Sequence, residues 1–259
     1  MTPPTGAATP LYLQWEFWSA LVALAALILS QLPPILVLFK GTKLRVEAAA
    51  QIIVSHRMGN PNLLLSLNLG NVGGSDVRVR AIDFEATRGT GEKLLMPGNQ
   101  YYESWTSTSA VMLTPFRLKP NEDWAHAVNF FPLLSPEEEK EQRQLSFDLR
   151  NNIMAKRALL PKDAPDVEAD EKVVLPLKAL YAKRNRWAPG EYTLTLNVAT
   201  EPNRASVRKH YRFTLFESDC ELLRGVTEQY SYGAWIIFDP PVNQWNRPTV
   251  ITQLKQIPI

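Results

Sequence analysis

The longest apolar run of the chain lies near its N-terminus, in residues 17–39. These 23 residues carry no charge, and only Ser19, Ser30 and Gln31 among them are clearly polar. A soluble helix of this length would show a polar stripe at a period of 3.6 residues, which is absent, and the run is long enough to cross the hydrocarbon core of a bilayer. The pattern predicts a transmembrane helix over 17–39.

The flanks of this run predict its orientation. Residues 1–16 contain no Lys or Arg, so they lack the basic start of a cleavable signal peptide. The positive-inside rule then places the N-terminus outside and the following domain in the cytoplasm, as a single-pass membrane protein. The side chains expected to anchor the helix at the two membrane interfaces are Trp15, Trp18, Lys40, Lys43 and Arg45.

Two adjacent prolines, Pro33 and Pro34, predict a kink in the second half of the helix. Proline removes a backbone donor and clashes with the preceding turn. Two interpretations stay open, namely a tolerated bend in a lone anchor and a surface that packs on another membrane subunit.

Alternating apolar positions predict strands in the rest of the chain. Leu63, Leu65, Leu67 and Leu69 share one face of a strand, and a Gly-rich turn follows before a second alternating segment at 77–88. This pair of segments predicts a β-hairpin, and a change of phase in the second segment, near Ala81, predicts a bulge.

Further alternating segments lie at 109–118, 123–131, 188–198 and 206–216, and two of them, 123–131 and 188–198, begin near a Pro-Asn-Glu and a Pro-Gly-Glu turn. Such segments, without alternating βαβ units, are typical of antiparallel sandwiches. The predicted fold is therefore mainly β: an N-terminal transmembrane helix followed by an antiparallel immunoglobulin-like β-sandwich with one helical insertion. Whether residues 40–259 form one sandwich or two stays open.

The insertion is predicted from helix-start and helix-end signals. Ser135 and Glu138 form a capping box around Pro136, and Lys156 and Arg157 lie near the expected end of the helix. The expected organisation is a short N-terminal segment (1–16), the transmembrane helix (17–39), the first part of the sandwich (40–134), the helical insertion and connector (135–171), the second part of the sandwich (172–227) and an aromatic-rich tail (228–259).

The tail carries the candidate partner surface. Its aromatic side chains at Tyr230, Tyr232, Trp235 and Trp245 belong to residue types that are enriched at interfaces. Two roles stay open: the tail clamps the sandwich, or it docks on a partner.

Charge and motifs exclude several classes of function. All 28 basic and 25 of the 26 acidic residues lie after residue 39, which is too even a mixture for a nucleic-acid surface. Cys220 is the only cysteine and the three histidines are scattered, so neither a disulfide nor a metal site is predicted. Nucleotide-binding glycine motifs and a nucleophile elbow are absent from the sequence. No catalytic residue, cofactor or nucleic-acid partner is therefore expected.

The span 17–39, with residues 65–84 and 118–131, resembles bacterial single-pass membrane proteins of unknown role that carry a soluble immunoglobulin-like β-sandwich. The resemblance implies binding rather than catalysis. The leading hypothesis is a membrane-anchored, non-catalytic binding or scaffold protein, an accessory or adaptor subunit whose partners are the lipid bilayer and another protein. The alternative is a membrane effector or pore-type subunit whose kinked helix oligomerises, with the sandwich as sensor. Under this alternative the chain would form a homo-oligomer. An enzyme with a site assembled from scattered residues is the third hypothesis.

Overall fold

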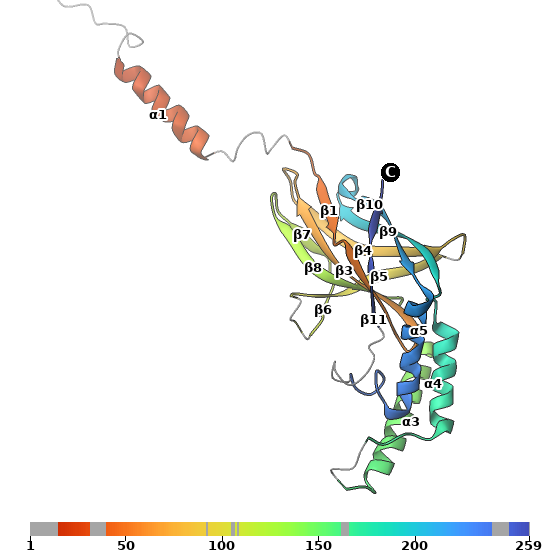
Figure 1. The fold of residues 1–259 in the computed structure, drawn as a ribbon. Coiled ribbons are helices and arrows are strands. Elements are labelled where there is room, and N and C mark those ends of the chain that lie inside the picture. The colour runs from red at the N-terminus through yellow and green to blue at the C-terminus, as the bar shows by residue number, and fades with distance from the viewer. Residues whose placement is uncertain are drawn as a thin grey trace, which may run out of the picture.

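Two layers of β strands, with helices gathered at one end, make up most of the structure, which is a computed structural model (Figure 1). The structure describes residues 15–31, 40–91, 93–104, 107, 109–161, 166–239 and 249–258. Every pairing between its named strands is antiparallel. The chain is therefore mainly β and antiparallel, as the alternation predicts.

The strands form two layers, here called sheet A and sheet B. Sheet A contains, in spatial order, β11 (Thr249–Gln253), β2 (Gln51–Arg57), β3 (Asn60–Asn71), β8 (Asp123–Phe130) and β5 (Lys93–Tyr102), with β1 (Leu44–Ala48) beside β3 and β6 (Val111–Met112) beside β5. Sheet B contains β5, β4 (Val77–Arg88), β9 (Gly190–Glu201), β10 (Val207–Leu215) and β12 (Lys255–Ile257), with β7 (Phe116–Leu118) beside β4.

Strand β5 belongs to both layers. Its residues 93–97 pair with β4 and its residues 98–102 pair with β8, with a register shift after Gly98. A Cβ atom at Gly98 would lie 2.7 Å from the carbonyl oxygen of Ile82, so only glycine allows this close crossing. One hydrogen-bonded path therefore runs through both layers, which corrects the expectation of an immunoglobulin-like sandwich with two separate sheets.

A single core fills the space between the layers. The four alternating leucines of β3 are at most 2% exposed, and they face Phe84, Leu194 and Leu196 of sheet B within one cluster. The rings of Phe84 and Phe130 meet across the layers at 4.5 Å. Burying each such side chain stabilises the fold by roughly 1.5–3 kcal/mol. Because the cluster draws on both layers, the strands form one sandwich-like unit rather than two.

The prediction that β3 and β4 form a β-hairpin is wrong, because the two strands do not pair with each other. β3 pairs with β1, β2 and β8, whereas β4 pairs with β5, β7 and β9. The turn at 72–76 bonds instead to the segment before β1: Val72 N donates to Lys43 O at 3.0 Å, and Gly74 N donates to Lys40 O at 2.9 Å. The turn therefore carries the chain from sheet A to sheet B. The predicted bulge is confirmed by the register shift between Val79 and Ala81.

The helices pack together at one end of the sheets (Figure 1). Helix α3 (Pro136–Arg157) begins at Ser135 with the predicted capping box, which is confirmed. Helices α4 (Glu171–Arg184) and α5 (Glu217–Gly225), and the 3-10 segments η2 (Asn203–Ala205) and η3 (Val226–Tyr232), were not predicted. A second apolar cluster joins α3, α4 and η3 around Leu149, Leu177 and Tyr230.

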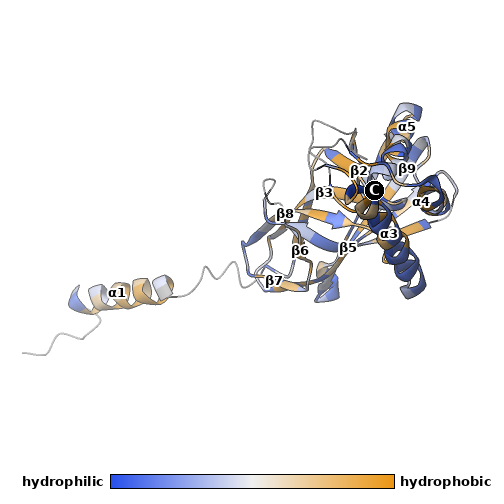
Figure 2. Cartoon of the chain, turned by 90° about the horizontal axis from the view of Figure 1, so that it is seen from below, coloured by the Kyte–Doolittle hydropathy of each residue, from blue (hydrophilic) through white to orange (hydrophobic). Residues whose placement is uncertain are grey.

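The apolar N-terminal run forms helix α1 (Trp15–Gln31), which lies apart from the sheets and is mostly apolar in Figure 2. At 1.5 Å per residue, its 17 residues reach about 26 Å, less than the roughly 30 Å of a bilayer core. Within the described part of the chain, none of the helices combines the length and apolar character that crossing a membrane requires. The expected transmembrane helix over 17–39, and with it the single-pass localisation, is therefore wrong. The predicted kink at Pro33 and Pro34 lies outside the described residues.

Candidate functional site

Titratable side chains do not gather into a reactive centre in the described residues. No group of three or more His, Cys, Asp or Glu side chains there is placed to hold a metal ion. Burial raises the pKa of the Cys220 thiol, which is the opposite of what an activated nucleophile needs. His56 lies in the core with both ring nitrogens bonded to backbone groups, so it has a structural role.

The outer face of sheet B is charged, and three ion pairs lie on it. Arg78 binds Glu201 at 3.6 Å, Lys93 binds Glu85 at 2.7 Å, and Arg212 binds Glu191 at 3.8 Å. Such exposed pairs contribute little to stability, but they give this face a solvated surface.

The outer face of sheet A differs in its chemistry. Cross-strand partners point to the same side of a sheet, so the strand register identifies the residues that face outward. In the middle of the sheet, between α3 at one end and Arg45 of β1 at the other, the outward residues of β3, β8 and β5 are uncharged: Asn62, Leu64, Ser66, Asn68, Ala125, Ala127, Asn129, Gln100 and Tyr102. The two outer faces of the sandwich are thus chemically unlike.

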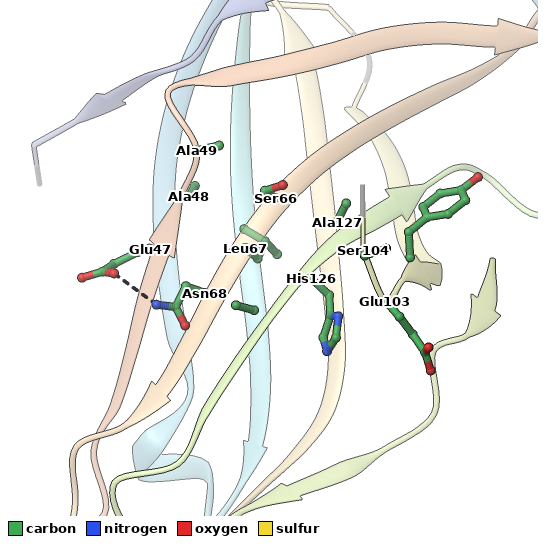
Figure 3. Close-up of a pocket in the computed structure, with 12 residues that line it drawn as sticks. Glu47, Ala48, Ala49, Ser66, Leu67, Asn68, Glu103, Ser104, His126 and Ala127 are labelled. Carbon is green, nitrogen blue, oxygen red and sulfur yellow. Dashed lines mark hydrogen bonds between the residues drawn. The ribbon is translucent and has the colours of Figure 1, made fainter. Parts of the chain in front are cut away.

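A first hollow of about 330 Å³ lies on this uncharged face (Figure 3). Small side chains, including Ser66 and Ala127, line it between the neighbouring strands, and Glu47 lies at its edge. Asn68 donates weakly to Glu47 Oε2 at 3.5 Å, while its own carboxamide oxygen is buried and accepts no hydrogen bond from any described residue. The hollow is therefore lined by small side chains, and beside them lies one acceptor, the Asn68 carboxamide oxygen, without a hydrogen bond from the described residues.

His126 also belongs to the lining of this hollow, but the register turns its ring inward, opposite Leu67. The ring packs at 4.9 Å on Tyr101 and at 4.7 Å on Trp124. Its Nδ1 atom is buried and has no hydrogen-bond partner among the described residues. The ring therefore takes part in the aromatic packing between the sheets as well as lining the hollow.

A second hollow of about 430 Å³ lies between the same face of sheet A and the first turns of α3. Its volume is within the range of small-ligand sites. Carboxamide side chains from three strands and one helix line it, together with apolar residues of the segment that leads into α3. Its lining includes Asn60, Asn62, Gln100, Asn129, Leu133 and Gln142.

The residues predicted as a partner surface are divided between the core and the surface. Tyr230 is 1% exposed and lies in the helical cluster, where burial raises the pKa of its hydroxyl above the ordinary range. Trp235 packs against the same cluster and donates from Nε1 to Gln229 at 2.8 Å, and Tyr232 is half-buried. Trp245 lies outside the described residues. This part of the tail thus packs on the helices, while β11 and β12 extend the two sheets.

The residues predicted as membrane-interface anchors lie in two different places. Trp15 and Trp18 are exposed on α1, whereas Lys40 and Lys43 lead into sheet A. Arg45 is on β1 and contacts Glu47 at 3.5 Å and Asp123 at 3.8 Å. Their role as interface anchors was predicted together with the transmembrane helix over 17–39, and it stays a prediction.

Sequence reasoning missed the carboxamides of the second hollow. The outward positions of β3 showed a polar alternation, but only the strand register places Asn62, Asn129 and Gln100 on one face. Comparison of the chain with protein-family models, curated proteins and solved structures found no match. The resemblance stated above therefore stays a prediction, and function must be inferred from these surfaces.

Proposed function

We propose that this chain is a non-catalytic binding protein, an adaptor or scaffold subunit that holds another protein on the outer face of sheet A. The observation that carries the proposal is the contrast between the two outer faces. Sheet B presents paired charges to solvent, whereas sheet A presents amide, hydroxyl and small apolar side chains around two hollows.

This contrast has a physical reason in a binding protein. The buried centre of a protein interface is poor in charged residues, because each charge must be desolvated when the partner docks. Ser66, Ala125 and Ala127 impose little desolvation cost and leave room for the partner's side chains. Paired charges frame the face at its far end, where Arg45 lies between Glu47 and Asp123.

Helix α1 supports an assembly role in a different way. Nine large apolar side chains on it are between 39% and 78% exposed. A monomeric protein rarely leaves so much contiguous apolar surface in water. The pore-type alternative has a more specific requirement, a spanning helix, which the described residues do not supply.

The test compares one charge inserted on each outer face. Ser66→Arg places a guanidinium in the first hollow, and Thr193→Arg places the same group on the exposed outer face of β9. Each tagged full-length chain is purified from cells that naturally produce the protein, and co-purifying proteins are quantified by mass spectrometry. We expect a stoichiometric partner of the unmodified chain to be lost with Ser66→Arg and retained with Thr193→Arg. Equal recovery with both variants would contradict the proposal.

A further inference from the structure

The second hollow brings together five carboxamide side chains that are far apart in the sequence. Asn60 and Asn62 come from β3, Asn129 from β8, Gln100 from β5 and Gln142 from the second turn of α3. They are held by the sheet register, in which Asn129 is the partner of Gln100 and of Leu64. Their convergence is therefore a property of the tertiary fold and not of a local motif.

Most of the bonding capacity of these carboxamides is unused. Asn62, Gln100 and Asn129 make no side-chain hydrogen bond within the described part of the chain. Asn60 donates to Pro132 O at 3.1 Å, which leaves its oxygen available. Gln142 accepts from Arg184 Nη1 at 2.7 Å, which leaves its amide nitrogen available. Each group thus offers donors, acceptors or both toward the hollow.

One wall of the hollow is apolar. Phe131, Pro132 and Leu134 line it, and Leu133 is 70% exposed at the same wall. Two charged side chains complete the lining: Glu139, which is bonded to Arg143, and Arg57, which lies at the exposed end of β2. The site therefore combines neutral polar groups with an apolar wall, with little net charge.

We infer that this cleft binds an extended, uncharged segment of a partner polypeptide. A carboxamide pairs its C=O with a backbone N–H and its NH₂ with a backbone C=O, so several of them can bind one extended peptide backbone. The aliphatic wall then receives an apolar side chain of the same segment. The inference deepens the proposed function and rests on it, because it names the kind of chain that sheet A would hold.

An oligosaccharide fits this lining less well. A sugar ring packs its C–H face on a broad exposed aromatic ring, and the apolar wall consists mainly of aliphatic side chains and proline, with Phe131 half-buried. Leu133, the most exposed apolar group of the wall, suits an apolar side chain rather than a hydroxylated ring.

The probe for this inference is a phage-displayed library of random dodecapeptides selected on the immobilised full-length chain. Enriched peptides are synthesised with a fluorophore, and their Kd is measured by fluorescence anisotropy. Asn62→Leu and Asn129→Leu remove the hydrogen-bonding groups at similar side-chain size. One hydrogen bond contributes about 1 kcal/mol, so each variant should weaken binding about fivefold and the double variant on the order of 20-fold.

Asn197→Leu is the matched control. Asn197 is half-buried on the outer face of sheet B and its carboxamide already binds Arg208 Nε at 2.8 Å, so its loss should leave peptide binding unchanged. Circular dichroism and the urea midpoint establish that each variant is folded. Gln100→Met, a nearly isosteric change on β5, provides the same test if a leucine variant does not fold.

Three results would overturn the inference: no enrichment of any peptide, enriched peptides that bind all variants equally, or binding to a glycan array that Asn62→Leu and Asn129→Leu abolish. The first two leave the proposed function standing if Ser66→Arg still removes a cellular partner. Loss of that effect as well would overturn both.

Discussion

His56 joins the sheets to the helices, and its replacement by leucine is the sharpest test of this packing. The side chain comes from β2 and is 6% exposed. Its Nε2 atom donates to Leu223 O of α5 at 2.8 Å, and its Nδ1 atom accepts from Gly59 N at 3.3 Å. Its ring lies 4.9 Å from that of Tyr181 on α4. One neutral imidazole therefore satisfies two backbone groups where three elements meet.

The expected loss of stability in the His56→Leu variant follows from those two hydrogen bonds. His56→Leu keeps a similar volume but leaves a buried carbonyl and a buried N–H without partners. Each such group costs about 1–3 kcal/mol, and the added apolar burial offsets a part of this. We expect the free energy of unfolding to fall by about 3 kcal/mol, a large share of the roughly 5–15 kcal/mol of an ordinary domain.

His56 should also make the stability of the fold depend on pH. Desolvation lowers the pKa of His56 below its ordinary value of 6.5, and the bond to Leu223 O opposes this only in part. The unfolded chain therefore binds a proton at a higher pH than the folded chain. The stabilisation is fully present above pH 6.5 and is lost as the pH falls through the pKa of the folded state. His56→Leu should remove this part of the pH dependence.

Urea unfolding, followed by tryptophan fluorescence, measures both effects at a series of pH values. Trp187 is 3% exposed in the core and so reports on the unfolding of the sheets. His210→Leu serves as the control, because His210 is only half-buried and its ring contacts Thr195 Oγ1 at 3.0 Å on the outer face of sheet B. A His56→Leu variant within about 0.5 kcal/mol of the unmodified chain, or with the same pH dependence, would refute the reasoning.

Two further predictions concern a glycine and the N-terminal helix. Gly59 has φ +82°, and a Cβ atom there would meet Tyr181 O at 2.5 Å, so Gly59→Ala should lower the free energy of unfolding by at least about 2 kcal/mol. Gly89→Ala, at φ +55° with open space around it, should cost only about 1 kcal/mol, and equal losses in urea unfolding would contradict this. Leu24→Glu on α1 should leave urea unfolding of the sheets unchanged, because the side chain is 57% exposed, and should reduce self-association measured by light scattering. A lowered urea midpoint would show that α1 packs on the sheets.

The strands were predictable where alternation is strict and one face is buried. Leu63 to Leu69 on β3, and Tyr192 to Val198 on β9, show that pattern without interruption. Helix α3 was predictable because its capping box and terminal charges are local signals. In each case the residues that decide the element are neighbours in the sequence.

Other elements depend on contacts that a local pattern does not contain. Helix α4 has Pro176 in its interior and no side-chain cap at Asp170, so its usual signals are missing. The glycine turn after β3 has hairpin chemistry, yet a Cβ atom at Gly73 would lie 2.4 Å from Gly41 O, which shows how closely the turn packs on the segment before β1. The apolar run predicts one helix over 17–39, whereas the described helix is Trp15–Gln31.

The candidate site could not be predicted for the same reason. Asn62, Asn129 and Gln100 are separated by tens of residues, and their common face follows from the pairing of β3, β8 and β5. The predicted partner surface relied on residue type alone, and Tyr230 illustrates the weakness of that criterion because it is buried among the helices.

The central claim is that the outer face of sheet A, and not that of sheet B, contacts another protein. Ala125 and Ala199 are exposed alanines on the outer faces of β8 and β9, so a photo-crosslinking p-benzoylphenylalanine can replace either with similar disturbance. After irradiation of living cells that naturally produce the protein, we predict one discrete cross-linked partner from position 125 and none from position 199. The same cross-linked product from both positions, or a product from position 199 alone, would contradict the account.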